Sequence, residues 1–482
     1  MGVIDPPTAA LTPAVTGNVR VFDSPELPAD PVALGALAVG VRGADLAAPA
    51  VALPDFHVKG DKEMPSSIAI ATRSTIRPTF SSASLNCGMA LVALDVDRPS
   101  EAAVADFFRR FRERYPYPTG FRRDLSQHEV VRAASEGAAF AVQRFGVSGD
   151  DVARVELGGR LDVDRFGGAQ RVRRELPWSV RELSRIRFGT IGPSNHFVEL
   201  QEVVDVFDPW AAARLGLSLG QVTLQFHGGG GSLPGELGLL FARRRRYPRA
   251  VRFQMAVQKP LYHYGRARSV GQLRRRRALY FNEPAPPVER DSAEGERVAF
   301  ANAMAMNYGF AFRLSTLASM RPLLGASLGV RDGALVVDTV HNSIYEEQVG
   351  AEQAIVHRHN ACRIFPAETL PGHPAFAETG QPLLVPGTHR TSSYLCVPGA
   401  RAAAALHTVC HGAGTVVSEL ARREDSPRRA PTRRTLRFRY RADEPVAVPH
   451  LPDDGVDAVV RALERHGIVR PIVRLRPFAV LN

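Results

Sequence analysis

The sequence predicts a mixed α/β (α+β) protein with one large domain. Short runs rich in β-branched residues, typical of strands, alternate with segments in which apolar residues recur every three or four positions, typical of helices. Motifs of histidine, cysteine and glycine follow these runs from residue 55 to residue 482, and no linker divides them. The length of 482 residues alone allows one to three domains. We therefore expect a single catalytic domain over residues 51–482.

The first 50 residues differ from the rest of the chain. They are rich in alanine, proline and glycine and show little periodicity, which favours a loosely structured lead-in over a separate domain. The N-terminus lacks a basic segment followed by an apolar core, so we expect no signal peptide. No uncharged apolar run approaches the length of a membrane span. A soluble, cytoplasmic protein without membrane contact is expected.

The predicted elements follow the order of these patterns along the chain. Strands are expected at 66–72, in a segment ending near 84–89, and at 91–95, 222–226, 335–340 and 472–481. Helices are expected at 102–115, 129–145, 179–186, 299–317, 416–420 and 456–466. The four cysteines are too few and too scattered for a disulfide framework.

The chain is strongly basic, with a formal net charge of +12 and an isoelectric point near 10.0. This balance favours a polyanionic partner, with RNA or DNA first, although an arginine-rich composition also reflects codon bias in a GC-rich genome. Arginine runs at 243–246, 274–277 and 428–439 are candidate contacts to a nucleic-acid backbone. Such runs also form solvated faces, so both interpretations stay open.

One stretch combines a histidine with glycines at the predicted start of a helix, Cys410-His411-Gly412-Ala413-Gly414. Glycines let the backbone approach a ligand closely, and the free N–H groups of a helix N-terminus attract anions. A neutral imidazole there can attack phosphorus and hold a phosphoryl or nucleotidyl group covalently. A lone His-Gly pair also fits a histidine that caps a tight turn.

Three histidines and one cysteine lie at the ends of apolar runs, beside glycine or asparagine: His196, His227, His341 and Cys87. Strand ends far apart in sequence can converge on one pocket, and a thiolate with imidazoles suits Zn, Mn, Fe or Co. No local spacing such as His-x-x-x-His links the four residues. A shared metal site and four separate structural residues are therefore both compatible with the spacing.

A series of short motifs, taken in order, resembles those of the RtcB-type RNA-splicing ligases. The motifs are Pro54-Asp55-Phe56-His57, Leu85-Asn86-Cys87-Gly88, Gly189-Thr190-Ile191-Gly192-Pro193-Ser194-Asn195-His196-Phe197, Val337-Asp338-Thr339-Val340-His341-Asn342, Val356-His357-Arg358, Pro386-Gly387, Thr391-Ser392-Ser393-Tyr394 and Cys410-His411-Gly412-Ala413-Gly414. The likeness spans about residues 50–482 with order and spacing kept. The chain is identified as a divergent member of this family.

The resemblance implies central β-sheets surrounded by helices, with an active site at the strand ends. It also implies a GTP-dependent ligase that joins an RNA 3′-phosphate or 2′,3′-cyclic phosphate end to a 5′-hydroxyl end, as in tRNA splicing or RNA repair. His411 matches the histidine that takes GMP from GTP, and the ligands of the family's metal, usually Mn²⁺, match Cys87, His196, His227 and His341. The matches to nucleotide-binding positions are Asn195, His196, Phe197, Val198, Glu199, His341, Asn342, Pro386, Gly387, Thr388, His389, Ser393, His411, Gly412, Ala413, Gly414 and Asn482.

Four positions depart from the family pattern. Ser84 stands where the family has a metal-binding aspartate, and Gly231 stands where the loop after His227 normally carries an arginine. Thr415 replaces the arginine that follows His-Gly-Ala-Gly, and Asn482 replaces a near-terminal lysine that helps hold the guanylate.

The loss of the carboxylate at Ser84 predicts one tightly bound ion instead of two, because a neutral hydroxyl is a poor partner for a hard cation. The expected ligands of this ion are Cys87, His227 and His341. The position nearer His196 should fill weakly, or only with GTP present. If two ions bind tightly, Glu199 or Asp55 is the candidate replacement for the lost carboxylate.

Three functions stay open from the sequence. The first is an active ligase that uses GTP and Mn²⁺, which the retained His411 and metal ligands favour. The second is a ligase-dead relative that binds RNA ends or a nucleotide as a repair or regulatory module, which the four substitutions favour. The third is a metal-dependent phosphoesterase that opens cyclic ends without consuming GTP.

Overall fold

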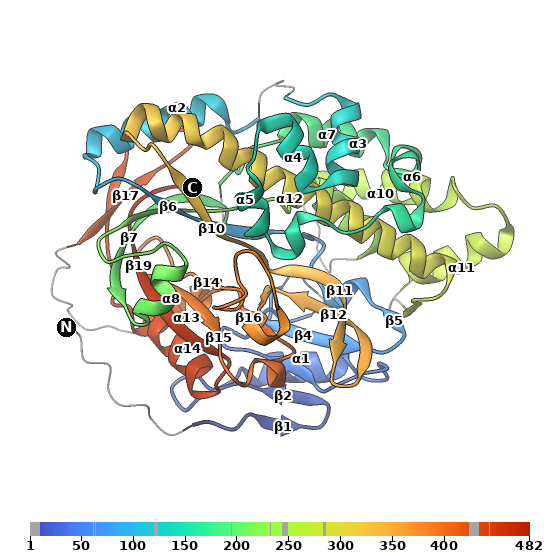
Figure 1. Cartoon of the computed structure of the whole chain (residues 1–482). Helices are drawn as coiled ribbons and strands as arrows, with labels where there is room; N and C mark the ends of the chain where they lie inside the picture. Colours follow the sequence, from blue (N-terminus) through green and yellow to red (C-terminus); the bar gives the residue numbers. More distant parts are fainter. Residues whose placement is uncertain are drawn as a thin grey trace.

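The structure is a computed structural model that describes the chain except for residues 1–9, 61, 63, 120–123, 194, 232, 243–248, 283–285, 424–432 and 443. Within the described residues, two large sheets occupy the centre of the molecule and helices surround them (Figure 1). The predicted mixed α/β architecture is confirmed.

The larger sheet positions most of the strand ends that carry motifs, and it has nine strands in the described part of the chain. In spatial order they are β10 (Gly333–Val340), β6 (Gly88–Leu94), β8 (Val222–Gly228), β7 (Phe197–Val206), β19 (Val469–Leu481), β15 (Ser393–Pro398) and β14 (Leu383–Val385), with β17 (Arg434–Phe438) and β18 (Val446–Pro449) alongside. Strands β10, β6, β8 and β7 pair antiparallel, with Val340 opposite Gly88, Gly88 opposite Gly228, and Phe197 opposite His227. This register brings one end of each of these strands to the same edge of the sheet.

The smaller sheet includes the N-terminal part of the chain. Its six strands, among the residues described, are β1 (Ala14–Thr16), β2 (Val19–Val21), β3 (Ala50–Ala52), β4 (Ile68–Thr72), β12 (Glu352–His359) and β11 (Asn342–Val349). The structure thus differs from the loose lead-in expected over residues 1–50, because 14–50 contain β1, β2 and helix α1 (Pro31–Gly40). Val21 and Leu37 are buried in one cluster with Ile68 and Ile70. Small apolar residues form this core although the sequence of the segment shows no clear helical or strand periodicity.

Two short strand pairs and a set of helices complete the fold. The pairs are β13 (Ala361–Arg363) with β16 (Thr408–Cys410) and β5 (Thr75–Ile76) with β9 (Val288–Glu289). The remaining helices are α2 (Glu101–Arg114), α3 (Gln127–Glu136), α4 (Ala138–Phe145), α5 (Gly149–Ala153), α6 (Gly168–Glu175), α7 (Trp178–Arg187), α8 (Pro209–Arg214), α9 (Leu233–Phe241), α10 (Arg249–Tyr264), α11 (Val270–Phe281), α12 (Ala293–Leu328), α13 (Gly414–Arg423) and α14 (Asp454–Arg465). In the described residues no helix combines the length and apolar character needed to span a membrane.

One predicted helix is divided in the structure, and one predicted strand is displaced along the chain. The helix expected over 129–145 is divided into α3 and α4 by Gly137, whose φ is 58°. A Cβ at Gly137 would lie 2.2 Å from the carbonyl oxygen of Gly159, so only glycine fits this break. The strand expected to end near 84–89 instead begins at Gly88, and Cys87 lies in the turn before it.

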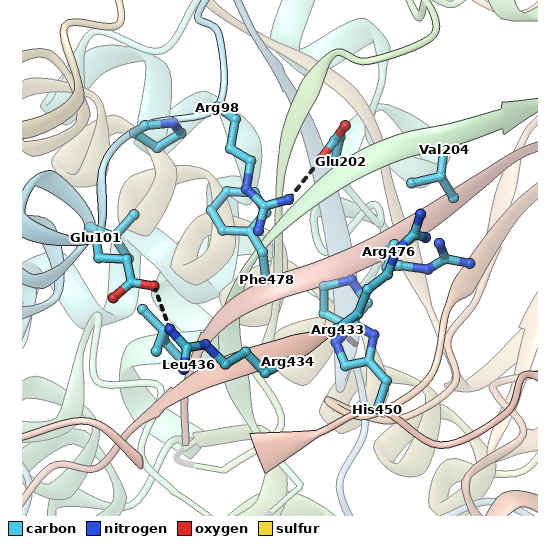
Figure 2. Close-up of a pocket in the computed structure, with 13 residues that line it drawn as sticks. Arg98, Glu101, Glu202, Val204, Arg433, Arg434, Leu436, His450, Arg476 and Phe478 are labelled. Carbon is cyan, nitrogen blue, oxygen red and sulfur yellow. Dashed lines mark hydrogen bonds and ion pairs between the residues drawn. The ribbon is translucent and has the colours of Figure 1, made fainter. Parts of the chain in front are cut away.

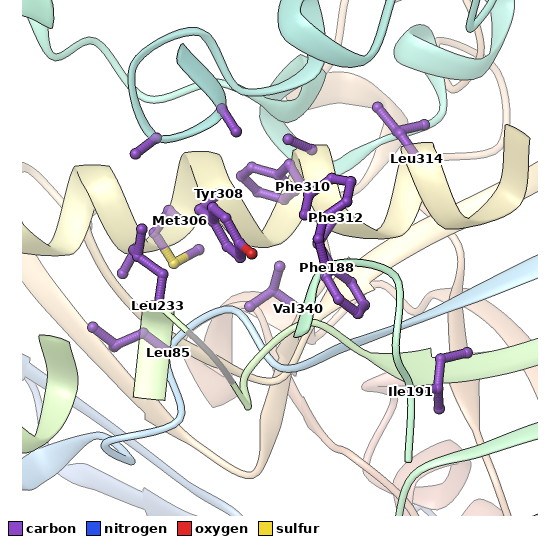
Figure 3. Close-up of a cluster of buried hydrophobic side chains, with 14 of the residues drawn as sticks. Leu85, Phe188, Ile191, Leu233, Met306, Tyr308, Phe310, Phe312, Leu314 and Val340 are labelled. Carbon is purple, nitrogen blue, oxygen red and sulfur yellow. The ribbon is translucent and has the colours of Figure 1, made fainter. Parts of the chain in front are cut away.

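Helix α12 packs against the turns at this edge of the larger sheet and contributes many residues to the core. Ser292 caps its first turn by accepting the N–H of Gly295 at 3.1 Å, and Gly329 ends it with φ of 76°. Residues 300–317 of the helix are buried and mostly apolar, as expected for a helix within a large protein. Tyr308 and Phe312 of α12 lie beside Phe188, with ring centroids 5.8 and 5.7 Å away (Figure 3). This packing joins α12 to the loop after α7.

Candidate active site

The four predicted metal ligands converge at the shared edge of β10, β6, β8 and β7. Cys87 Sγ lies 3.3 Å from His196 Nε2 and 3.2 Å from His227 Nε2. His227 Nε2 lies 2.9 Å from His341 Nε2. Donor atoms that surround one ion with bonds of about 2.0–2.3 Å are themselves roughly 3–4 Å apart. The spacing of Cys87, His227 and His341 therefore fits a thiolate–imidazole metal site, and His196 adjoins it through Cys87.

The histidine tautomers also fit a metal. His227 Nδ1 donates a hydrogen bond to the carbonyl oxygen of Asn195 at 2.7 Å, and His196 Nδ1 donates to that of Ile191 at 3.0 Å. Both Nε2 lone pairs are thereby directed at the cluster, which is the usual arrangement around a ligating histidine. Burial alone would raise the pKa of Cys87, but His227, His196 and His341 hold that pKa well below its usual value. The cysteine is thus set up as a thiolate.

Arg313 of α12 holds the ligand-bearing turns in place. Its fully buried guanidinium pairs with Asp338 of β10, with Nε 2.9 and 2.8 Å from the two carboxylate oxygens. Its Nη1 donates to the backbone and side-chain oxygens of Asn86, both at 2.8 Å, and to the carbonyl of Gly228 at 3.3 Å. Since Asn86 precedes Cys87 and Gly228 follows His227, one arginine positions two ligands.

Close packing explains two glycines of this region. Asn86 adopts φ of 50°, and Gly309 of α12 packs so tightly on it that a Cβ there would lie 2.6 Å from Asn86 Cγ. A Cβ at Gly230, in the loop after His227, would lie 2.7 Å from Cys87 Cβ. The glycine-rich loop thus lies directly against the cysteine.

Among the described residues, the group whose donor atoms are close enough to share one ion is Cys87, His227 and His341, all within 4.8 Å of one another. It contains no carboxylate. The two residues expected to replace the lost carboxylate make other hydrogen bonds. Glu199 accepts one from Gln201 Nε2 at 2.7 Å, and Asp55 accepts one from the N–H of Val416 at 2.9 Å. These three residues are the ligands expected for a single tightly bound ion. The number of bound ions remains a prediction.

His411 lies next to this cluster, between the end of β16 and the start of α13. Its ring centroid is 4.8 Å from that of His341, and its N–H is bonded to the carbonyl of Asn360 at 3.2 Å. Its Nδ1 is buried without a hydrogen-bond partner among the described residues. Burial and the neighbouring His341 and Lys59 hold the pKa of His411 well below its usual value. The imidazole is therefore neutral near pH 7.

A cavity of about 270 Å³ opens beside His411. The predicted nucleotide-binding residues that line it are Asn195, Phe197, Glu199, Pro386, Gly387, Thr388, His389, Ser393, His411, Gly412, Gly414 and Asn482. The predicted residues outside its lining are His196, Val198, His341, Asn342 and Ala413. Val198 is fully buried in the core, and Ala413 is held by a bond from its N–H to Pro386. Most of the predicted set is thus brought together around one space.

Comparison with known proteins identifies the family. The family profile described as tRNA-splicing ligase RtcB matches residues 44–482. The chain belongs to the RtcB family. It is 29% identical over 418 residues to the RNA-splicing ligase RtcB of Mycobacterium tuberculosis, which covers 83% of this chain and 88% of that protein. It is 27% identical over 422 residues to the tRNA-splicing ligase RtcB of Pyrococcus abyssi, which covers 82% of this chain and 42% of the relative. The chain spans about two fifths of the length of the archaeal relatives from Pyrococcus and Methanopyrus.

The substitutions that set this RtcB chain apart are distributed around the site. Thr415 Oγ1 contacts His57 Nε2 at 3.3 Å, and Asn482 Oδ1 accepts from Arg437 Nε at 2.8 Å. Both line the cavity beside His411, and so does Lys59, which supplies a cation to the wall that Asn482 leaves neutral. Gly231 instead lines a different cavity, together with His196.

Sequence reasoning did not place His57 and Lys59 in the site, and it named Asp55 only as a possible replacement for the lost carboxylate. All three residues line the cavity. Burial raises the pKa of Asp55 to about 7 against the hydrogen bond from Val416, and burial raises that of Glu199 to about 8. Perturbed carboxyl groups of this kind are typical of functional pockets. The signal available in the sequence was the dense Asp-x-His-x-Lys segment itself.

The arginine runs are only partly surface features. In the run 274–277, Arg276 is buried and pairs with Glu294 at 2.6 Å, so it stabilises the fold and is not available for RNA. The other three arginines of this run are exposed. The run 243–246 and residues 428–432 of the basic loop lie outside the described residues.

Proposed function

We propose that this chain is a GTP- and Mn²⁺-dependent RNA ligase that acts through a guanylylated His411. One observation carries the proposal: a neutral, partly exposed imidazole lies between a thiolate–imidazole cluster and a cavity lined by the predicted nucleotide-binding residues. Membership of the RtcB family and the ligase names of its relatives support this assignment.

His411 supplies the nucleophile in this proposal. Its lone pair attacks the α-phosphorus of GTP, a P–N bond forms, and pyrophosphate leaves. Gly412 and Gly414 allow the nucleotide to approach the backbone, and the N-terminus of α13 favours the negative phosphates. Lys59 adds positive charge to the same cavity.

The RNA ends then react in two steps. An oxygen of the RNA 3′-phosphate attacks the GMP phosphorus, the P–N bond breaks, and the imidazole is released. The 5′-hydroxyl of the second RNA next attacks the 3′-phosphate, forms the phosphodiester, and releases GMP, while a 2′,3′-cyclic end first needs hydrolysis by water. Mn²⁺, held by Cys87, His227 and His341 with His196 nearby, would neutralise charge on the reacting phosphates.

A separate basic cavity of about 440 Å³ supports an RNA partner. Figure 2 shows Arg98, Arg433, Arg434 and Arg476 around it, with Arg98 stacked 4.7 Å from the ring centroid of Phe478. Glu202 and Glu101 pair with Arg98 and Arg434 at 3.1 and 3.4 Å, so the lining keeps a net positive charge. Arginine side chains in such a cavity suit contacts to the phosphates of a nucleic-acid backbone, whereas the ring of Phe478 is buried.

An end-joining assay tests the proposed function. Two RNA strands, one ending in a 2′,3′-cyclic phosphate and one starting with a 5′-hydroxyl, are incubated with the protein, GTP and Mn²⁺. We expect a joined product that requires both GTP and metal. Opening of the cyclic end with no joined product, even when GTP is present, would instead identify a phosphoesterase. Salt-sensitive binding of the strands without turnover would identify a ligase-dead relative.

The Ser84→Asp variant tests the consequence of the lost carboxylate. Ser84 and Cys87 share one turn, since the carbonyl of Ser84 accepts the N–H of Cys87 at 3.2 Å. We expect the unmodified protein to bind one ion tightly and the variant to approach two, with faster guanylylation of His411, because a carboxylate adds negative charge beside the cations. Metal analysis after dialysis measures the stoichiometry.

Ser100→Asp is the matched control, because Ser100 caps α2 and aspartate serves equally well as an N-cap. It adds the same charge outside the candidate site and should leave the stoichiometry unchanged. Two tightly bound ions in the unmodified protein would show that the single-ion prediction is wrong.

A further inference from the structure

A second cavity adjoins the metal cluster, on the side of His196. It has a volume of about 360 Å³, and His196, Gly229 and Gly231 form the wall nearest the cluster. The nucleotide cavity meets the cluster through His227 and Asn195 instead. Cys87 Sγ lies 3.3 Å from His196 and 3.2 Å from His227, so the cluster separates the two cavities. A ligand in either cavity therefore lies next to the same metal position.

The lining of the second cavity favours an anion with a planar group attached. Arg187 is its formally charged residue, and none of its described lining residues is acidic. Phe312 and Ile191 give it an apolar wall, and Tyr117 presents a ring that is 42% exposed. A guanidinium binds phosphate in a bidentate manner, and an exposed aromatic ring stacks on nucleic-acid bases.

The position of Arg187 bears on a residue that this chain lacks. Gly231 stands where the family motif has an arginine, and it lines this same cavity. A Cβ at Gly231 would lie 3.8 Å from a ring carbon of His196, so a side chain at this position projects toward the metal cluster. Arg187, the last residue of α7, lines the cavity from a different element. A cation therefore remains in the cavity although the loop has lost its own.

We propose that the second cavity binds the 3′-terminal nucleotide of the RNA, with Arg187 holding the terminal phosphate and Tyr117 stacking on the base. This inference rests on the proposed function, because it assigns the second substrate of the same site. Because the cluster borders both cavities, a phosphate held by Arg187 would share that metal position with a nucleotide bound beside His411. Arg187 thus keeps a cation in the cavity that Gly231 lines.

Binding of short RNAs tests the assignment without requiring catalysis. An oligonucleotide with a 3′-phosphate and its 3′-hydroxyl counterpart are titrated against the full chain in the presence of Mn²⁺. We expect the unmodified protein to prefer the phosphorylated end and Arg187→Ala to lose about 10- to 100-fold of that preference, as for a charged hydrogen bond. Arg187→Lys should restore part of it. Arg174→Ala, an exposed arginine of α6 outside the cavity, is the matched control and should behave like the unmodified protein.

A second readout separates this inference from the proposed function. Arg187→Ala should accept label from GTP on His411 as well as the unmodified protein does, but pass it to 3′-phosphorylated RNA about 10- to 100-fold more slowly. An unchanged preference for the 3′-phosphate in Arg187→Ala, with normal labelling, would overturn the role of Arg187 alone. Absence of label in the unmodified protein would overturn the proposed function, and the binding titration would still decide whether Arg187 recognises phosphate.

Discussion

The Arg313→Met variant is expected to lose about 3–5 kcal/mol of unfolding free energy, because it leaves the carboxylate of Asp338 buried without its partner. Methionine fills a similar volume, so a cavity contributes little. Arg313 and Asp338 are almost completely inaccessible to solvent, and the lost guanidinium also served both oxygens of Asn86. Urea unfolding at constant metal concentration measures the change. A loss this large compares with the whole stability of many domains.

Two controls isolate the buried pair. Arg331 is 91% exposed, and its Nε lies 3.8 Å from Asp95 Oδ2, so this ion pair is long and solvated. Arg331→Met should therefore change the free energy of unfolding by less than about 0.5 kcal/mol. The double variant Arg313→Met with Asp338→Asn should recover part of the loss, since it removes the stranded charge. If Arg313→Met alone cost less than about 1 kcal/mol, the arginine would not hold the ligand turns as described.

The convergence of the four predicted metal ligands could be anticipated because each of these residues follows or precedes a recognisable apolar run. Cys87, His196, His227 and His341 lie at the ends of four adjacent strands. The antiparallel pairing of these strands brings those ends to one edge of the sheet. The glycines of Gly412 to Gly414 similarly marked the start of α13. Local chemistry was therefore sufficient for this part of the site.

Contacts between distant elements were beyond the reach of sequence patterns. The mostly apolar run predicted a helix over 299–317, but the partner of Arg313 lies 25 residues away, on β10. A charged residue inside such a run was the available signal, since buried arginines are paired. The lead-in expected over residues 1–50 differs for a related reason, because β2 and β3 gain their core from Ile68 and Ile70.

The separation of His196 and His227 into two cavities also depends on tertiary packing. Both histidines contact Cys87, and no spacing distinguishes them. The loop after α7, which packs on Phe312 through Phe188, lines the cavity that His196 borders. Lys59 lines the cavity beside His411, and its position there depends on how the smaller sheet packs against the larger one.

The second large effect is expected at His411. Replacement by alanine removes the nucleophile and should abolish covalent attachment of GMP, a loss of more than about a thousandfold, as for the nucleophile of other covalent catalysts. The neutral state of this imidazole predicts that attachment does not require a pH above 7. His128→Ala, an exposed histidine of α3, is the matched control and should label normally.

The most direct measurement is transfer of label from GTP to the protein in the presence of Mn²⁺. GTP labelled at the α-phosphate should leave one acid-labile, alkali-stable label on each active chain, whereas GTP labelled at the γ-phosphate should leave none. Removal of the metal or the His411→Ala substitution should eliminate the label. Absence of label with every divalent metal tested, or label that persists in His411→Ala, would contradict the proposed guanylylated histidine.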